Sequence, residues 1–174
     1  MSIRLNKTYN LNSHIIKHFE KASENLILLN ITLESDSLKL DSRPIHKRYD
    51  FGDFPPLDIS IDSETGLVKE ITIFINKRNI LIKHDMEKVD LTNLVGYPSF
   101  SFDMLKKHEY YYDEVCQMEI SICDSTLLVC VLDEEARKKI IVNEALNILL
   151  NDRDEFSGFS LNCLSINDLQ FLKS

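Results

Sequence analysis

The stretch that decides the fold is Leu57-Asp58-Ile59-Ser60-Ile61-Asp62, followed by Ser63-Glu64-Thr65-Gly66. Apolar and polar residues alternate through positions 57–62, which is the period of a β-strand with one buried face. Gly66 can adopt the left-handed backbone conformation that closes a tight turn. The apolar pattern then resumes, so we predict a β-hairpin over residues 57–75. The apolar residues of the returning strand are Leu67, Ile71, Ile73 and Ile75.

Strand-like patterns also fill the second half of the chain. Residues 115–122 and 127–132 flank the polar turn Asp124-Ser125-Thr126, which predicts a second antiparallel pair. Residues 139–150 are ambiguous, because their β-branched start favours a strand and their Glu-Ala-Leu centre favours a helix. We favour a strand there, and another short strand over residues 158–164.

Few segments have the spacing of a helix. Residues 12–23 place Ile15, Ile16 and Phe19 at helical intervals, residues 102–111 form a second candidate, and Ser165 can cap a final helix that runs to Leu172. The sequence therefore predicts an α+β fold, a mostly antiparallel β-sheet with one to three helices. A length of 174 residues suits a single globular domain spanning residues 1–174.

Composition narrows the class of protein. The chain is 44% hydrophobic and 28% charged, as in ordinary globular proteins. Its apolar runs are far shorter than the ~20 residues of a membrane-spanning helix. The opening residues contain no apolar core typical of a secretory signal, so we expect a cytoplasmic protein. The four cysteines form no C-x-x-C pair, and in that compartment we expect reduced, buried thiols.

Motifs that would indicate catalysis or a metal are missing from the sequence. His14 and His18 are four residues apart, which on a helix can hold a metal, but Ile15 stands where a catalytic zinc motif has Glu, and we favour two surface histidines on an amphipathic helix. Asp58 and Asp62 share a strand face, and the polar side of a hairpin accounts for both. The glycines never cluster into a phosphate-binding loop. We therefore expect no enzyme activity, no cofactor and no metal.

Charge is distributed unevenly along the chain. Residues 1–87 carry 12 basic and 13 acidic residues, whereas residues 88–174 carry 8 and 15, so nearly all of the net charge of −8 lies in the second half. Such a field repels nucleic acids and anionic lipids and attracts basic proteins, although acidity can also serve solubility alone. A stretch from residue 109 to 135 contains no Lys or Arg. Its acids are Glu109, Asp113, Glu114, Glu119, Asp124, Asp133, Glu134 and Glu135.

The tyrosine run at positions 110–112 is the strongest candidate for a binding site. Three consecutive rings cannot all face a core in a strand or a helix, so at least one must be exposed. Tyrosine is enriched at protein interfaces, because its large stiff ring ends in a polar group. Packing of two rings in the core and one on an edge strand would explain the run without function. The candidate partner-binding residues are Tyr110, Tyr111, Tyr112, Asp113, Glu114, Asp133, Glu134 and Glu135.

A resemblance to a known class of proteins adds a specific hypothesis. The segment from Phe51 to Asp62, then Thr65-Gly66 and Ile71-Thr72-Ile73-Phe74-Ile75, resembles stretches in bacterial immunity proteins of polymorphic and contact-dependent toxin systems. This resemblance covers about a third of the chain and transfers no functional residues. It implies a small acidic inhibitor that covers the functional surface of a toxin, such as the basic groove of a nuclease.

Three functions follow as hypotheses. The first is an immunity protein that binds a basic toxin domain, and it predicts a tight one-to-one complex. The second is a structural or adaptor subunit of a cytoplasmic assembly, which predicts a homo-oligomer or an extended apolar patch. The third is an enzyme whose site is assembled from scattered residues, which predicts a concave pocket with convergent polar groups.

Overall fold

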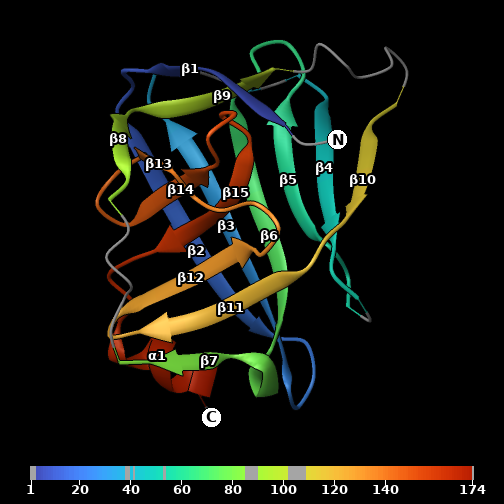
Figure 1. Cartoon of the computed structure of the whole chain (residues 1–174), viewed down its shortest axis with the longest axis vertical. Helices are drawn as coiled ribbons and strands as arrows, with labels where there is room; N and C mark the ends of the chain where they lie inside the picture. The colour runs from blue at the N-terminus through green and yellow to red at the C-terminus, as the bar shows by residue number, and fades with distance from the viewer. Residues whose placement is uncertain are drawn as a thin grey trace.

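Two β-sheets packed face to face form the body of the protein. The computed structural model describes residues 3–37, 40, 42–52, 54–84, 90–101 and 109–173. In Figure 1 the seven-stranded sheet, sheet II, lies in front of the six-stranded sheet, sheet I, and its strands run across β2 (Ser13–Lys21), β3 (Leu26–Ser35) and β6 (Val68–Asn76) of sheet I. Side chains from both sheets, such as Leu29 and Ile73 of sheet I and Val129 and Phe159 of sheet II, are fully buried in one apolar core. The chain is therefore held together by burial between two layers.

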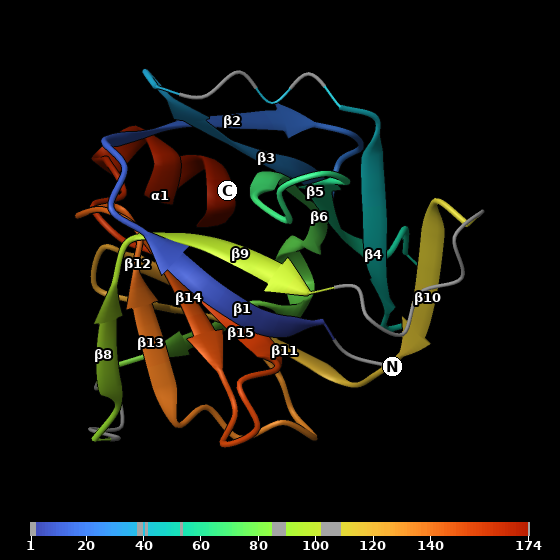
Figure 2. The same ribbon diagram turned by 90° about the horizontal axis from the view of Figure 1, so that it is seen from above.

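Sheet I has the strand order β10-β4-β5-β6-β3-β2 among the described residues. Figure 2 shows that this sheet curves, with β2 and β3 along one side of the molecule and β4 and β10 along another. β10 joins β4 in a parallel arrangement, and the remaining neighbours are antiparallel. The strands are β2 (Ser13–Lys21), β3 (Leu26–Ser35), β4 (Pro44–Asp50), β5 (Leu57–Asp62), β6 (Val68–Asn76) and β10 (Tyr111–Val115).

The predicted hairpin is confirmed at the centre of sheet I. β5 and β6 pair antiparallel, and their alternate apolar side chains are buried. The Asp62 side chain accepts hydrogen bonds from the backbone of Glu64 and Thr65, which organises the turn. Gly66 has a φ of 74°, and a Cβ there would overlap the carbonyl oxygen of Phe100. Glycine is required at this position for both reasons.

Sheet II has the order β7-β11-β12-β15-β14-β13-β8 in the described part of the chain. The predicted turn at Asp124 is confirmed, and it joins β11 to β12. Residues 139–150 are not one strand but two, because the Asn143 side chain accepts hydrogen bonds from the backbone of Ala145 and Leu146 and turns the chain. The strands are β7 (Leu81–Lys83), β8 (Thr92–Val95), β11 (Met118–Cys123), β12 (Thr126–Val131), β13 (Lys138–Ile141), β14 (Leu146–Leu150) and β15 (Phe156–Leu161).

Sheet direction is mixed, so the expected antiparallel character needs correction. The central strands pair antiparallel, but β7, β8 and β10 each add to a sheet edge in parallel. Parallel neighbours require crossover connections that local sequence patterns do not reveal. The fold is nevertheless rich in β-strand, as expected.

The two ends of the sandwich are closed by different elements. A ribbon of β1 (Arg4–Tyr9) and β9 (Tyr97–Ser101) crosses the upper end in Figure 1. The helix α1 (Ile166–Lys173) closes the lower end, beside the short 3-10 turn η1 (Lys77–Asn79). The predicted cap is confirmed: the Ser165 hydroxyl accepts from the Asp168 amide, and the Asp168 carboxylate accepts from the Ser165 amide.

One predicted helix is wrong. Residues 13–21 form the strand β2, in which Ile15, Lys17 and Phe19 face the core and Ile16 faces outward with 53% of its surface exposed. Lys17 donates a hydrogen bond to Asp168 of α1 at 2.6 Å, so an inward-facing lysine interrupts the alternation that would have indicated a strand. The other candidate, over residues 102–111, lies largely outside the described residues; its last residue, Tyr111, begins β10.

The four cysteines are free thiols in different surroundings. Cys123 is buried as expected, Cys116 and Cys130 are half-buried, and Cys163 is exposed, which corrects the expectation that all four are buried. Cys163 also has a φ of 55° in the connection before α1. No helix in the described ranges has the length and apolar character needed to cross a membrane.

Candidate protein-binding site

Strand β10 carries the predicted tyrosines to the edge of sheet I. Its side chains alternate: Tyr111, Asp113 and Val115 face outward and are exposed, whereas Tyr112 and Glu114 face inward and are half-buried. In the parallel pairing with β4, Tyr111 lies opposite His46 and Asp113 opposite Arg48. The tyrosine run is therefore divided between two environments, as the sequence requires.

Two tyrosine rings are held on the surface by cations of the β4 region. The Arg43 guanidinium lies over the Tyr110 ring, 3.5 Å from its centre, and the Arg48 guanidinium lies 4.8 Å from the centre of the Tyr111 ring. His46 stacks on Tyr111 with a centroid distance of 4.9 Å. Tyr110 is 37% exposed and Tyr111 is 55% exposed. These five residues form what we call the tyrosine–arginine surface, and stacking fixes the rings in place.

Asp113 is neutralised where it stands. The Arg48 guanidinium donates to both carboxylate oxygens of Asp113, through Nε at 2.6 Å and Nη2 at 2.7 Å. These hydrogen bonds hold the pKa of Asp113 below its usual range and raise that of Arg48. The pair lies on the outer face of the sheet in contact with solvent. Among the candidate partner-binding residues, Asp113 therefore presents a paired charge.

Glu114 serves a different purpose on the opposite face. Its carboxylate accepts a hydrogen bond at 2.7 Å from the Lys47 ammonium, and the Lys47 side chain is only 2% exposed. The same ammonium lies 4.9 Å from the centre of the Tyr49 ring. Burial disfavours the charged form of Glu114, but hydrogen bonds and nearby positive charge, to which Lys47 contributes both, hold the pKa of Glu114 below its usual range. Glu114 therefore compensates a buried cation and belongs to the interior of the fold.

His46 also binds a carboxylate from the neighbouring strand. Its Nδ1 lies 2.9 Å and 3.1 Å from the two oxygens of Asp58. Asp58 is therefore engaged with His46, while Asp62 is buried in the turn and does not form an acidic pair with it. No described serine, threonine or cysteine hydrogen-bonds to the His46 ring. As it stands, the pair orients the histidine under Tyr111.

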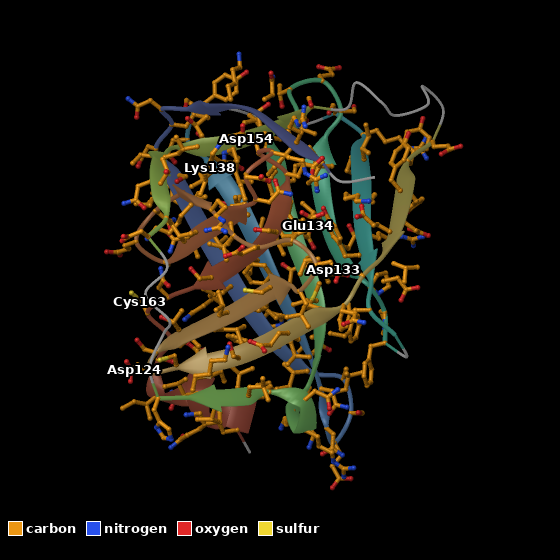
Figure 3. All side chains as sticks on the ribbon, viewed as in Figure 1. Asp124, Asp133, Glu134, Lys138, Asp154 and Cys163 are labelled. Atoms are coloured by element: carbon orange, nitrogen blue, oxygen red, sulfur yellow. The ribbon has the colours of Figure 1, made fainter. Side chains whose placement is uncertain are left out.

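The second predicted cluster, residues 133–135, follows β12 on sheet II. Figure 3 shows Asp133 and Glu134 side by side in this connection. Glu134 accepts hydrogen bonds from Asn151 and from Arg153 at 3.0 and 3.1 Å, and Glu135 pairs with Arg137 at 2.7 Å. An open depression of ≈ 380 Å³ lies among these side chains. Its lining is Asp133, Glu134, Glu135, Arg137, Asn151, Asp152 and Arg153.

The two predicted clusters approach each other near Cys116. Burial raises the pKa of the Cys116 thiol to about 11, and the carboxylates of Glu114 and Asp133 contribute to that rise. The chain crosses here between the sheets, since Cys116 donates to the Asp50 carbonyl of β4 and Leu132 donates to Gln117. By contrast, Figure 3 places Asp124 on the other side of the molecule. The acidic stretch is thus divided in space, and at least five of its acids have cationic partners among the described residues.

Those five pairs explain why local sequence overstated the negative field. All the cationic partners lie outside residues 109–135, and all but Arg137 come from distant segments. The pairs are Asp113–Arg48, Glu114–Lys47, Glu119–Lys83, Glu134–Arg153 and Glu135–Arg137. Sequence reasoning also missed Arg43, His46 and Arg48 as members of the site. The only hint in the sequence was that residues 43–48 are rich in basic side chains. Without the pairing of β4 with β10, nothing in the sequence connects these side chains with the tyrosines.

The histidine pair at positions 14 and 18 lies on strand β2. Both side chains are exposed on its outer face, and His14 contacts Asp36 at 3.3 Å. The helical geometry that would bring the two rings to one metal is therefore absent. No group of three metal-binding side chains occurs within the described ranges.

Comparison with known proteins identifies no relative of this chain. No protein-family model matches the chain, and no curated protein sequence matches it significantly.

Proposed function

We propose that this protein binds another protein through the tyrosine–arginine surface, and that it acts as an immunity protein for a bacterial toxin. The observation that carries the binding proposal is the exposure of Tyr110 and Tyr111 beside Arg43 and Arg48. Tyrosine and arginine are enriched at the energetically important positions of protein interfaces. Rings already held by stacking lose little conformational freedom on binding, which favours affinity.

The immunity hypothesis rests on the sequence resemblance and on charge. Most of the resembling residues lie in β5 and β6, whose leucine and isoleucine side chains at positions 57, 59, 61, 71, 73 and 75 are buried in the core, so they bear on the fold and leave the binding face to other strands. The net charge of −8 supports a basic partner, because a field of that sign accelerates association with cations. An inhibitor needs only to cover the toxin's functional surface, and no catalytic residue is required.

Coexpression with the neighbouring reading frame tests the proposal. The product of that frame should arrest growth when expressed alone and should be harmless when this chain is present, and the two should purify as a one-to-one complex. A neighbouring product that is harmless alone, or whose toxicity this chain does not relieve, contradicts the immunity function.

Single substitutions then locate the interface. Tyr111→Ala should weaken the complex by about 2 kcal/mol, or roughly thirtyfold, as expected for a central interface aromatic. Val95→Ala is the matched control, because Val95 is also exposed on an edge strand but belongs to β8 of sheet II. Equal affinities of the two variants would place the binding face elsewhere.

A charge reversal separates local attraction from the overall field. Asp133→Lys with Glu135→Lys, both exposed, should slow association at low salt and have little effect at high salt. The control reverses Glu20 of β2 and Glu24 of the turn that follows it, both exposed, so the change in net charge is identical. If both double variants slow association equally, residues 133–135 have no local role.

A further inference from the structure

One side of β10 pairs with no strand in the described part of the chain. β10 is an outer strand of sheet I. The backbone hydrogen bonds at its two ends involve even-numbered residues: the Tyr110 carbonyl accepts from the His46 amide, and the Cys116 amide donates to the Asp50 carbonyl. Backbone groups of successive strand residues point to opposite sides. The amides and carbonyls of Tyr111, Asp113 and Val115 therefore point away from β4, and no described strand pairs with them.

The side chains of these three residues are symmetric about their centre. Tyr111 and Val115 are apolar, stand two residues on either side of Asp113, and are 55% and 86% exposed. If a copy of the strand runs antiparallel with Asp113 opposite Asp113, then Tyr111 lies opposite Val115 of the other copy, twice. An aromatic ring opposite a β-branched side chain is a favourable cross-strand pair.

Charge permits this register. Two aspartates that face each other would repel, but the charge of each Asp113 is balanced by its own Arg48, which donates to it through Nε and Nη2. On the inner face the same register places Tyr112 opposite Glu114, which avoids like charges. A shift by one step towards the carboxyl end would place Glu114 opposite Glu114, and a shift the other way would place Tyr111 opposite Asp113.

We propose that two copies of this chain associate through their β10 strands, antiparallel and centred on Asp113. The pairing joins the two copies of sheet I into one continuous sheet with two tyrosine–arginine surfaces side by side. A five-residue strand offers a small contact, below the ~1,200 Å² of stable complexes, so the dimer is weak and forms in the upper micromolar range. The proposal does not depend on the toxin or on the partner-binding function.

Sedimentation equilibrium on the whole chain tests the association. Between about 20 μM and about 1 mM the average mass should rise towards twice the monomer mass. Val115→Pro removes one outward amide and leaves the Cys116 bond to β4 intact, because the Val115 amide does not face β4. It should raise the dissociation constant at least about tenfold. Val115→Thr keeps the amide and should raise that constant less.

Amide exchange supplies a reading that depends on register. At high protein concentration the amides of Tyr111, Asp113 and Val115 should become protected, while those of Tyr112 and Glu114 should be protected at both concentrations by β4. A monomer at about 1 mM, a dimer that survives Val115→Pro, or protection that appears elsewhere would each overturn the proposal. If only a different protein protects these amides, the edge serves that partner and the second copy is excluded.

Discussion

The two adjacent ion pairs of β10 should differ sharply in their contribution to stability. Glu114→Ala removes the carboxylate from Lys47, whose side chain is 2% exposed, whereas Asp113→Ala removes the carboxylate from Arg48, which remains partly hydrated. The two substitutions occupy neighbouring positions on one strand and break the same kind of bond. Burial of the partner is the variable that differs.

The magnitude follows from that difference. Breaking a buried ion pair costs ~3–5 kcal/mol, because a charge is left in the interior without compensation. Glu114 is itself 24% exposed, and Lys47 keeps its contact with the Tyr49 ring, so we expect the lower end, about 3 kcal/mol. In a chain of this length that lowers the melting temperature by ~6–12 °C. For Asp113→Ala we expect less than ~1 kcal/mol.

Urea unfolding followed by circular dichroism measures both values, since the chain contains no tryptophan. A third variant, Lys47→Met with Glu114→Gln, removes the buried charge together with its partner and should recover most of the loss. If Glu114→Ala costs no more than Asp113→Ala, the Lys47 ammonium is reached by water, and the assignment of Glu114 to the interior is wrong.

Three further measurements test other parts of the structure. Burial raises the pKa of Asp62 and Glu114, but hydrogen bonds to both carboxylates outweigh it and lower the pKa. The contribution of these carboxylates to stability is therefore complete above their unfolded pKa near ~4 and is lost as the pH falls below it. The free energy of unfolding should drop between pH ~5 and ~3, and a flat profile would contradict this. Gly66→Ala should destabilise by at least ~1–2 kcal/mol in urea unfolding, from the left-handed conformation alone, and an unchanged midpoint would disprove the turn geometry. A native thiol titration should show one fast-reacting group that Cys163→Ser removes, because Cys123 is buried and burial raises the pKa of the half-buried Cys116 and Cys130 to about 11; more than one fast group would contradict this.

Local patterns predicted the elements whose stabilising contacts are local. The hairpin at β5 and β6 has strict alternation, and its turn is closed by Asp62 within the same few residues. The cap of α1 is likewise formed by two residues three positions apart. Both could be predicted because the residues that determine them are neighbours in sequence.

Long-range contacts determined what could not be predicted. The Lys17 side chain can point inward from β2 because its ammonium pairs with the carboxylate of Asp168, more than a hundred residues away. No pattern within residues 12–23 contains that information. The candidate site shows the same limit. Tyr111 and Asp113 were identified from sequence, but their cationic partners become neighbours only through the parallel pairing of β10 with β4.

The segment from Leu81 to Val115 supplies β7, β8 and β10, which form three of the four margins of the two large sheets in the described chain. The central strands come from before and after it. Replacement of this one interval by recombination would change three sheet edges at once, and the core would keep its residues if the replacement retained Tyr97 and Phe100 of β9, which are buried. A lineage could thus change its binding partners through a single contiguous exchange. A chimera that carries a foreign interval between β6 and β11 would likewise give engineered edge strands to unchanged central strands.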